Sequence, residues 1–302
     1  MYKNFMHETD KKICLMSFYK FKKIGNPISL KNNIKNLNKK NNFFGTILIS
    51  KEGINGTIAG YADFVQDFQK FLNINLSGSF SLKTQFINYI PFKKFKLKVK
   101  EQIIKIGNFN VEPEKSTGEF LTPKKWDESL HNDNTVVIDT RNFYESNIGS
   151  FKNSIFPMTK SFSEFPKWFK KNKHKFKNKN ILTYCTGGIR CEKATSYIKK
   201  LGFKRVYQLE GGILNYFKKV KENDSNFEGE CFVFDDRVSV NHSLNKGAFG
   251  ICYACGQPIT KVDFMSKFYE KGISCDNCYF KSTEEQKKKF RDRQNQYSSK
   301  NK

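Results

Sequence analysis

Hydrophobic and polar positions divide the first hundred residues into alternating strands and helices. The clearest helix is predicted in YADFVQDFQKFL, where Phe64, Phe68, Phe71 and Leu72 recur at helical spacing. The other expected elements are a strand over 13–24, a helix over 28–42 beginning near Ser29, two strands around a Gly-Asn-rich turn within 43–60, and strands over 79–90 and 93–106. This order predicts a ferredoxin-like α+β sandwich over residues 1–107.

The middle of the chain has a different pattern, with short apolar strands that alternate with helical segments. TVVIDTR, NILTYC and RVYQLEGGI are the strands, and a helix that begins close to Arg190 is predicted to end at Gly202. Alternation of this kind predicts an α/β domain with a parallel sheet, whose functional sites lie at the carboxyl ends of the strands. We assign residues 131–225 to it, 108–130 to a linker, and 226–302 to a small cysteine-rich module with a basic tail.

Composition narrows the class of protein. The chain of 302 residues has 54 Lys and Arg against 29 Asp and Glu, a net charge of +25, which favours an anionic macromolecular partner. The alternative is an AT-rich genome, which raises the lysine content everywhere. No apolar run reaches the ~20 residues of a membrane span, and the first residues resemble no secretion signal, so a cytoplasmic protein without a membrane partner is expected. The eight cysteines then suit metal ligation or thiol chemistry better than disulfides.

A row of lysines in the first domain is a candidate nucleic-acid contact. In KFKLKVK, apolar residues alternate with Lys94, Lys96, Lys98 and Lys100. In a strand this places the four ammonium groups on one face, about 6.6 Å apart. Such a row could follow a phosphate backbone without reading its sequence. The alternative is a solvated sheet face in a lysine-rich protein.

The segment YCTGGIRCEKA carries the strongest sign of catalysis. Cys185 ends a strand and Arg190 begins a helix. We predict that the N–H groups of the loop between them, formed by Thr186, Gly187, Gly188 and Ile189, converge on the sulfur and form an anion cradle. These groups, the helix N-terminus and the Arg190 guanidinium would favour a thiolate near neutral pH. Because the arginine is the fifth residue after the cysteine, the loop suits a guest of sulfur size, such as a persulfide.

A second group of cysteines has the spacing of a metal site. Cys252 and Cys255 form one CxxC pair, and Cys275 and Cys278 form another, separated from the first by nineteen residues. Four thiolates from two tight turns can complete a tetrahedral zinc site, which we expect to be structural. The alternatives are an iron–sulfur centre or a thiol cluster without metal.

Several of these motifs resemble known families. Asp139, Arg141, Cys185, Arg190 and the LEGG turn resemble the rhodanese pattern, and EGINGT, IDTRN, YCTGGIRCEKA, YQLEGGI and CFVFDDRV occur in the order found in rhodanese-type tRNA uridine(34) hydroxylases. The resemblance implies a catalytic Cys185 with a persulfide intermediate and hydroxylation of uridine 34 at C5 to 5-hydroxyuridine with molecular oxygen. It also implies that tRNA binds through its anticodon region, with help from the first domain. No obligatory protein partner is evident.

The role of individual residues in this chemistry is partly open. Cys191 belongs to this family's version of the loop and could resolve an oxidised Cys185 as a disulfide, or it could be a structural thiol. Modifying a base in an RNA loop would require it to be splayed out and stacked on an aromatic side chain, which the sequence does not single out. The residues also do not identify the electron donor. The alternative functions are a sulfurtransferase with a Cys185 persulfide and a non-catalytic RNA-binding adaptor.

Overall fold

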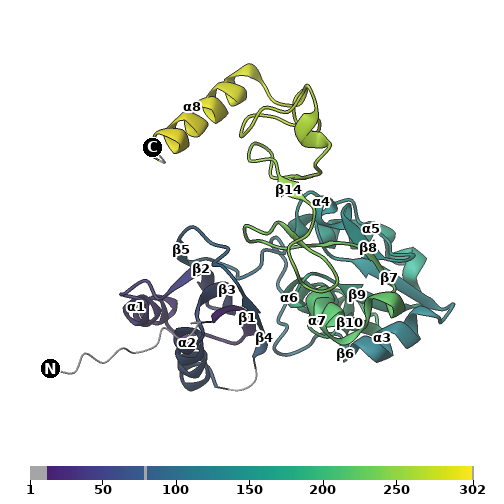
Figure 1. Ribbon diagram of the computed structural model, residues 1–302. Coiled ribbons are helices and arrows are strands. Elements are labelled where there is room, and N and C mark those ends of the chain that lie inside the picture. The colour runs from purple at the N-terminus through teal and green to yellow at the C-terminus, as the bar shows by residue number, and fades with distance from the viewer. Residues whose placement is uncertain (1–11, 78–79, 301–302) are drawn as a thin grey trace. The chain divides into compact units, whose positions relative to one another are not determined.

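The computed structural model describes residues 12–77 and 80–300, which form two compact units, 1–117 and 118–302 (Figure 1). The predictions for residues 1–11, 78–79 and 301–302 lie outside the described residues. Among the helices that are described, none has both the length and the apolar character needed to cross a bilayer.

The first unit contains the ferredoxin-like arrangement. Its elements are β1 (Ile13–Phe21), α1 (Pro27–Leu37), β2 (Phe43–Ser50), β3 (Gly53–Tyr61), α2 (Ala62–Asn75), β4 (Ser81–Ile87) and β5 (Phe95–Val99). The strand order is β4-β1-β3-β2-β5, in which β5 pairs in parallel with β2 and the other neighbours are antiparallel. The predicted sandwich is therefore confirmed, with an additional strand at one edge.

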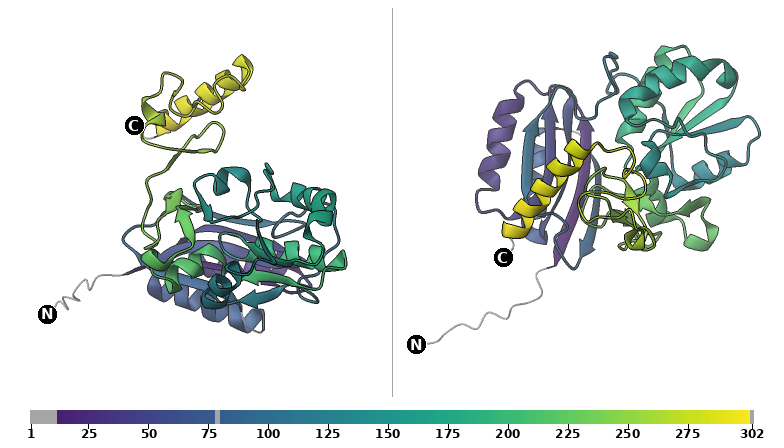
Figure 2. Two further views of the ribbon diagram at one scale, coloured as in Figure 1. Left: turned by 90° about the vertical axis from the view of Figure 1, so that its right-hand side faces the viewer. Right: turned by 90° about the horizontal axis from the view of Figure 1, so that it is seen from above.

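The core of the first unit lies between the sheet and its helices. Phe68 and Leu72 of α2 and Ile34 of α1 are fully buried among side chains of β1, β2 and β3. The right-hand view of Figure 2 shows α1 along one face of this sheet. The spacing of Phe68 and Leu72 thus identified the buried face of α2, whereas Phe64 is 39% exposed.

Two local predictions in this unit were wrong. Helix α1 spans Pro27–Leu37, because the Asn26 side chain accepts hydrogen bonds from the N–H groups of Ile28 and Ser29 and so caps the helix one turn earlier than Ser29 would. The predicted Gly-Asn-rich turn is confined to residues 51–52, and the glycines that follow belong to β3. Gly53 is required there because a Cβ would lie 2.0 Å from the carbonyl oxygen of Lys20.

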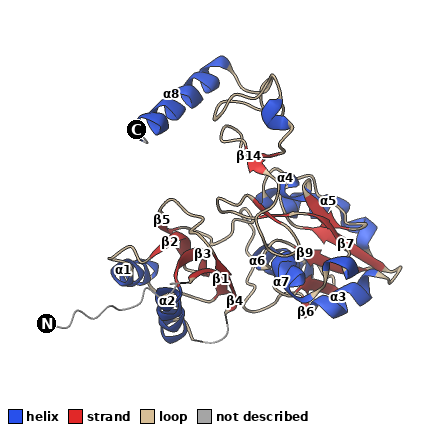
Figure 3. Ribbon diagram, in the orientation of Figure 1, coloured by secondary structure: helices blue, strands red, loops and turns tan. Residues whose placement is uncertain are grey.

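The second unit is built on a parallel sheet of order β6-β10-β9-β7. The strands are β6 (Glu119–Leu121), β7 (Thr135–Asp139), β9 (Asn180–Tyr184) and β10 (Val206–Leu209), drawn in red in Figure 3. The sheet confirms the α/β prediction and its three strands. The helices are α3 (Pro123–Leu130), α4 (Phe143–Ser146), α5 (Phe165–Asn172), α6 (Ile189–Lys200) and α7 (Gly212–Lys219), with 3-10 turns at Phe162–Glu164, Lys173–Phe176 and Glu222–Asp224.

The predicted linker over 108–130 was wrong for its second half. Strand β6 pairs in parallel with β10, and α3 buries Trp126 completely in the core of the second unit. Its proline and glycine content suggested a connection, but Pro123 occupies the first turn of α3, where a missing N–H costs nothing.

The boundary predicted at residue 226 was also wrong. Strand β11 (Phe227–Gly229) pairs with β8 (Gly149–Phe151), and β12 (Cys231–Phe232) pairs with β13 (Ser239–Val240). Phe227, Cys231 and Val240 are buried in the same core as the parallel sheet. The segment that follows holds β14 (Gly250–Ile251), β15 (Pro258–Ile259), a 3-10 turn at Asp263–Met265 and α8 (Glu284–Lys300).

Candidate functional site: a buried thiolate loop and a four-cysteine group

Cys185 lies at the carboxyl end of the parallel sheet, directly after β9 and before α6. The loop closes because Gly188 adopts φ = 104° as the residue before α6, a conformation that favours glycine. Its N–H donates a hydrogen bond to Cys185 Sγ at 3.0 Å, and the sulfur is fully buried. The Cys191 N–H donates to the same sulfur. Of the residues predicted to form the cradle, Gly188 donates to the sulfur, and the N–H of Cys191 is a second donor that the sequence did not indicate.

The electrostatics of the loop favour a thiolate. Burial by itself raises the pKa of Cys185, but this is outweighed by the hydrogen bond from the Cys191 thiol, by the positive charge of Arg190, and by the two backbone N–H donors. Together they lower its pKa to about 5. The sulfur therefore carries a negative charge at neutral pH although no part of it contacts solvent.

Arg190 is held by a residue that the sequence did not single out. Glu145 of α4 accepts hydrogen bonds from Arg190 Nη1 at 2.6 Å and Nη2 at 2.7 Å, and its carboxylate is fully buried. The loop thus contains a thiolate, a guanidinium and a carboxylate in one buried group. The spacing Asn142-x-x-Glu145 is a readable capping box, which the structure contains, but nothing local shows its pairing with a residue 45 positions later.

Asp139 and Arg141 contact the helix that carries Glu145. Their side chains form a fully buried ion pair, with Arg141 Nη2 at 2.6 Å from Asp139 Oδ2. Arg141 also donates to the carbonyl oxygens of Glu145 and Gly149, and the Ser146 hydroxyl donates to Asp139. The pair therefore links the end of β7 to α4, which carries Glu145.

The second glycine of the LEGG turn is required because the chain passes very close to the Cys185 loop there. The N–H groups of Ile213 and Leu214, at the start of α7, donate to the carbonyl oxygens of Cys185 and Thr186. Gly212 has φ = 65°, and a Cβ on it would lie 2.4 Å from the Cys185 carbonyl oxygen. Only glycine lets α7 approach the loop this closely.

Cys191 is the third residue of α6 and is also fully buried. Burial and the negative sulfur of Cys185, to which its thiol donates, raise the pKa of Cys191 well above its ordinary value. The Thr140 hydroxyl lies 3.6 Å from its sulfur. Of the two sulfurs, Cys191 thus retains the proton and Cys185 carries the charge.

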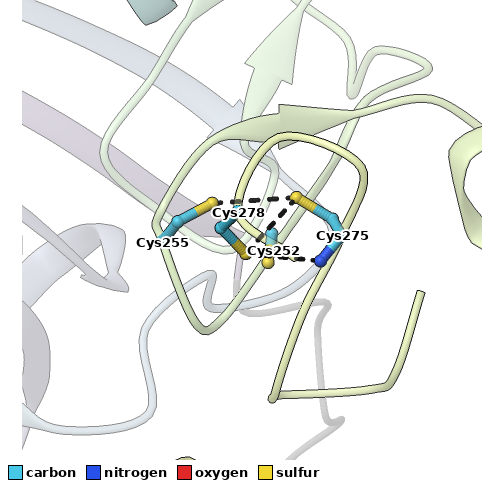
Figure 4. A group of neighbouring side chains, drawn as sticks. All are labelled: Cys252, Cys255, Cys275 and Cys278. Atoms are coloured by element: carbon cyan, nitrogen blue, oxygen red, sulfur yellow. Dashed lines mark hydrogen bonds between the residues drawn. The ribbon is translucent and has the colours of Figure 1, made fainter. Parts of the chain in front are cut away.

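The four cysteines of the two CxxC pairs come together in the C-terminal segment. The sulfurs of Cys252, Cys255, Cys275 and Cys278 all lie within 4.8 Å of one another (Figure 4). The Cys255–Cys275 and Cys275–Cys278 sulfur pairs are 3.8 and 3.9 Å apart. A tetrahedron with zinc–sulfur distances of about 2.3 Å has edges of about 3.8 Å, so the donor set fits such an ion. The group can hold a metal ion.

The lysine row is exposed as predicted. Phe95 and Leu97 of β5 pack against the core, while Lys96 and Lys98 are exposed. Lys94 and Lys100, which flank the strand, are also exposed, and backbone hydrogen bonds to β2 continue through both residues. The exposure of the row is confirmed, and its contact with nucleic acid stays a prediction.

A cavity of about 280 Å³ lies elsewhere on the second unit. Its lining includes Thr135 and Asn180, the first residues of β7 and β9. The cavity therefore opens at the amino ends of these strands, whereas Cys185 follows the carboxyl end of β9.

Comparison with known proteins gives matches to both units. A model described as UPF0176 acylphosphatase like domain matches residues 13–103, and a Rhodanese-like domain model matches 122–219. A tRNA uridine(34) hydroxylase of Prochlorococcus marinus subsp. pastoris is 41% identical over 289 residues, covering 94% of this chain and 93% of the relative. Another, from Brucella ovis, is 42% identical over 269 residues, covering 89% and 88%.

Proposed function

The chain belongs to the tRNA uridine(34) hydroxylase family, and we propose that it hydroxylates uridine 34 of tRNA at C5 with molecular oxygen as co-substrate. The observation that carries the proposal from the structure is the buried Cys185 thiolate in its N–H cradle beside Arg190. A thiolate placed in this way is a nucleophile at neutral pH.

Cys185 is the proposed catalytic residue. During the reaction Cys185 carries a persulfide, or its own sulfur is oxidised. The Gly188 and Cys191 N–H groups stabilise the negative charge on this side chain. Arg190 supplies the fixed positive charge of the loop, and Glu145 holds the guanidinium in place. Asp139 and Arg141 act only through Glu145 and are positioning residues.

Cys191 is the proposed resolving thiol. If Cys185 is oxidised to a sulfenic acid, attack by the Cys191 sulfur forms a disulfide and releases water. If Cys185 carries a persulfide, the same attack on the Cys185 sulfur forms the disulfide and releases hydrosulfide. The hydrogen bond between the two side chains supports this role, because it places the two sulfurs next to each other.

The other parts of the chain hold the substrate and the fold. We propose that Lys94, Lys96, Lys98 and Lys100 contact the tRNA backbone near the anticodon, and that the four-cysteine group binds structural zinc. Because the substrate is tRNA, the protein acts in the cytoplasm. The zinc would supply folding energy to the C-terminal segment and takes no part in oxygen chemistry in this proposal.

The test is mass spectrometry of tRNA from a deletion strain complemented with defined variants. We expect loss of 5-hydroxyuridine in the deletion strain, full rescue by the wild-type chain, and no rescue by Cys185→Ser. Cys14→Ser is the matched control, because Cys14 is buried in the other unit, and it should rescue fully. Loss of a thiolated base in place of 5-hydroxyuridine would indicate sulfur transfer, and rescue by Cys185→Ser would indicate a non-catalytic adaptor.

A further inference from the structure

One aromatic side chain beside the thiolate loop is exposed, although the two residues before it are buried. Phe232 is 4% exposed and Val233 is 5% exposed, but Phe234 is 65% exposed. A single exposed apolar side chain is ordinary on a protein surface, so it is the position of Phe234 beside the thiolate loop that makes it a candidate contact. The sequence did not separate Phe234 from the many other phenylalanines of the chain.

The turn that carries Phe234 is held rigidly. The Val233 N–H donates to the Val238 carbonyl at 2.8 Å and closes the turn. Within it, Asp235 accepts hydrogen bonds from the backbone N–H and the guanidinium of Arg237, and both side chains are buried. The Phe232 ring packs edge-on against the Phe234 ring, with centroids 5.2 Å apart. Phe234 is therefore a preorganised surface that a ligand need not order.

The same turn is attached to the thiolate loop. The Thr186 hydroxyl donates to the Phe232 carbonyl at 3.4 Å, directly next to Cys185. The guanidinium carbon of Arg190 lies 6.0 Å from the centre of the Phe234 ring. One residue, Arg190, thus contacts the reactive sulfur electrostatically and the exposed ring as a cation–π partner.

We propose that Phe234 is the platform on which the pyrimidine base of the target nucleotide stacks when it leaves the RNA loop. The inference rests on the proposed function and adds a substrate-contacting residue to the same site. Single-stranded RNA is recognised by splaying bases onto aromatic faces, and each stacked base contributes a substantial share of affinity. The position beside Arg190 places the stacked base next to a residue of the Cys185 loop.

The first experiment compares variants of the full-length enzyme on tRNA, with 5-hydroxyuridine measured by mass spectrometry. Phe234→Ala should lower kcat/KM roughly 10- to 100-fold, while Phe234→Trp and Phe234→Tyr should stay within about threefold of wild type, because both keep an aromatic face. Phe280→Ala is the matched control. Phe280 is 78% exposed and packs edge-on against Phe268 in the C-terminal segment, so its loss should leave kcat/KM unchanged.

The inference is overturned if Phe234→Ala has wild-type kcat/KM, or if Phe234→Leu rescues as well as Phe234→Tyr, since leucine keeps apolar area without an aromatic face. The thiolate absorbance of Cys185 is measured in each variant. It should not change, because Phe234 contributes nothing to the hydrogen bonds on the sulfur. A loss of that absorbance in Phe234→Ala would show that the residue acts on the loop and not on the base.

The second experiment does not depend on activity. An anticodon stem-loop with 5-iodouridine at position 34 is irradiated with the wild-type protein, and the cross-linked peptide is identified. We expect the cross-link at Phe234, and a cross-link only on other segments would refute the inference. If the wild-type enzyme makes no 5-hydroxyuridine, the proposed function fails and the cross-link still tests the base contact. If it makes 5-hydroxyuridine and Phe234→Ala does too, only the inference fails.

Discussion

The two cysteine sites of this chain place different partners around negative sulfur. At Cys185 the protein supplies two N–H donors, a thiol and the positive charge of the Arg190 guanidinium. At the four-cysteine group backbone N–H groups also donate, as that of Cys275 does to Cys278 Sγ at 3.3 Å, but the ionisable neighbours of each sulfur are other sulfurs, all within 4.8 Å. A thiolate that the protein already stabilises is available for chemistry, whereas clustered thiolates require a cation. The same residue type is therefore reactive in one place and structural in the other.

The largest expected effect is that of removing the metal from the four-cysteine group. Structural zinc sites contribute on the order of 10 kcal/mol to folding, so Cys275→Ser or a strong chelator should unfold the C-terminal segment. Metal content by mass spectrometry and hydrogen exchange by peptide should show loss of zinc and of protection over residues 250–280. The parallel sheet should remain protected. Retention of one zinc by Cys275→Ser would show that the four sulfurs do not form a single site.

The next effect tests whether the thiolate loop depends on its own internal charges. Glu145→Gln removes the carboxylate partner of Arg190 and leaves the buried guanidinium with the Cys185 thiolate as its counter-charge. Breaking a buried ion pair in this way costs about 3–5 kcal/mol, which denaturant unfolding of the second unit should detect.

The matched control for Glu145→Gln is Glu228→Gln, which breaks the exposed pair between Glu228 and Lys152. An exposed pair contributes at most about 1 kcal/mol, so this variant should unfold close to wild type. Equal stability of the two variants would show that Glu145 is not needed to hold Arg190. The Cys185 site would then not depend on its own charged side chains, and its contrast with the four-cysteine group would not hold.

A pH titration tests the charge on Cys185 directly. With its pKa lowered to about 5, the thiolate absorbance that Cys185→Ser abolishes should be complete at neutral pH and disappear as the pH falls through about 5. Between pH 5 and the unfolded pKa of about 8.5, the folded state binds fewer protons at Cys185 than the unfolded state does. The contribution of this thiolate to stability therefore grows as the pH rises through that range, and it is lost as the pH falls through 5. If the titration midpoint of the absorbance lay near the unfolded pKa of about 8.5, Cys185 would be mostly protonated at neutral pH and the proposed reactive thiolate would not exist.

The sequence predicted those parts of both sites that depend on local spacing. The spacing within each CxxC pair predicts a tight turn that can chelate one ion. The apolar residues directly before Cys185 predict that it follows a strand, which is β9. Glu145 was missed because its partner is 45 residues away and only the fold joins them. Phe234 was missed because exposure is decided by the turn around it and not by its residue type. The segments 118–130 and 226–240 were misassigned because their short strands gain partners only through distant pairing.

The smallest expected effect concerns the lysine row, which lies outside both cysteine sites. Lys96→Gln with Lys98→Gln should weaken tRNA binding roughly three- to tenfold and lower the slope of log K against log salt by about 2, because each phosphate contact releases about one counterion. Lys35→Gln with Lys70→Gln, on the helices α1 and α2, changes the net charge equally. If both pairs weaken binding alike, overall charge and not the row attracts the tRNA. If only the row matters, substrate binding by the first unit is separable from the thiolate loop, whose absorbance should be the same in both double variants.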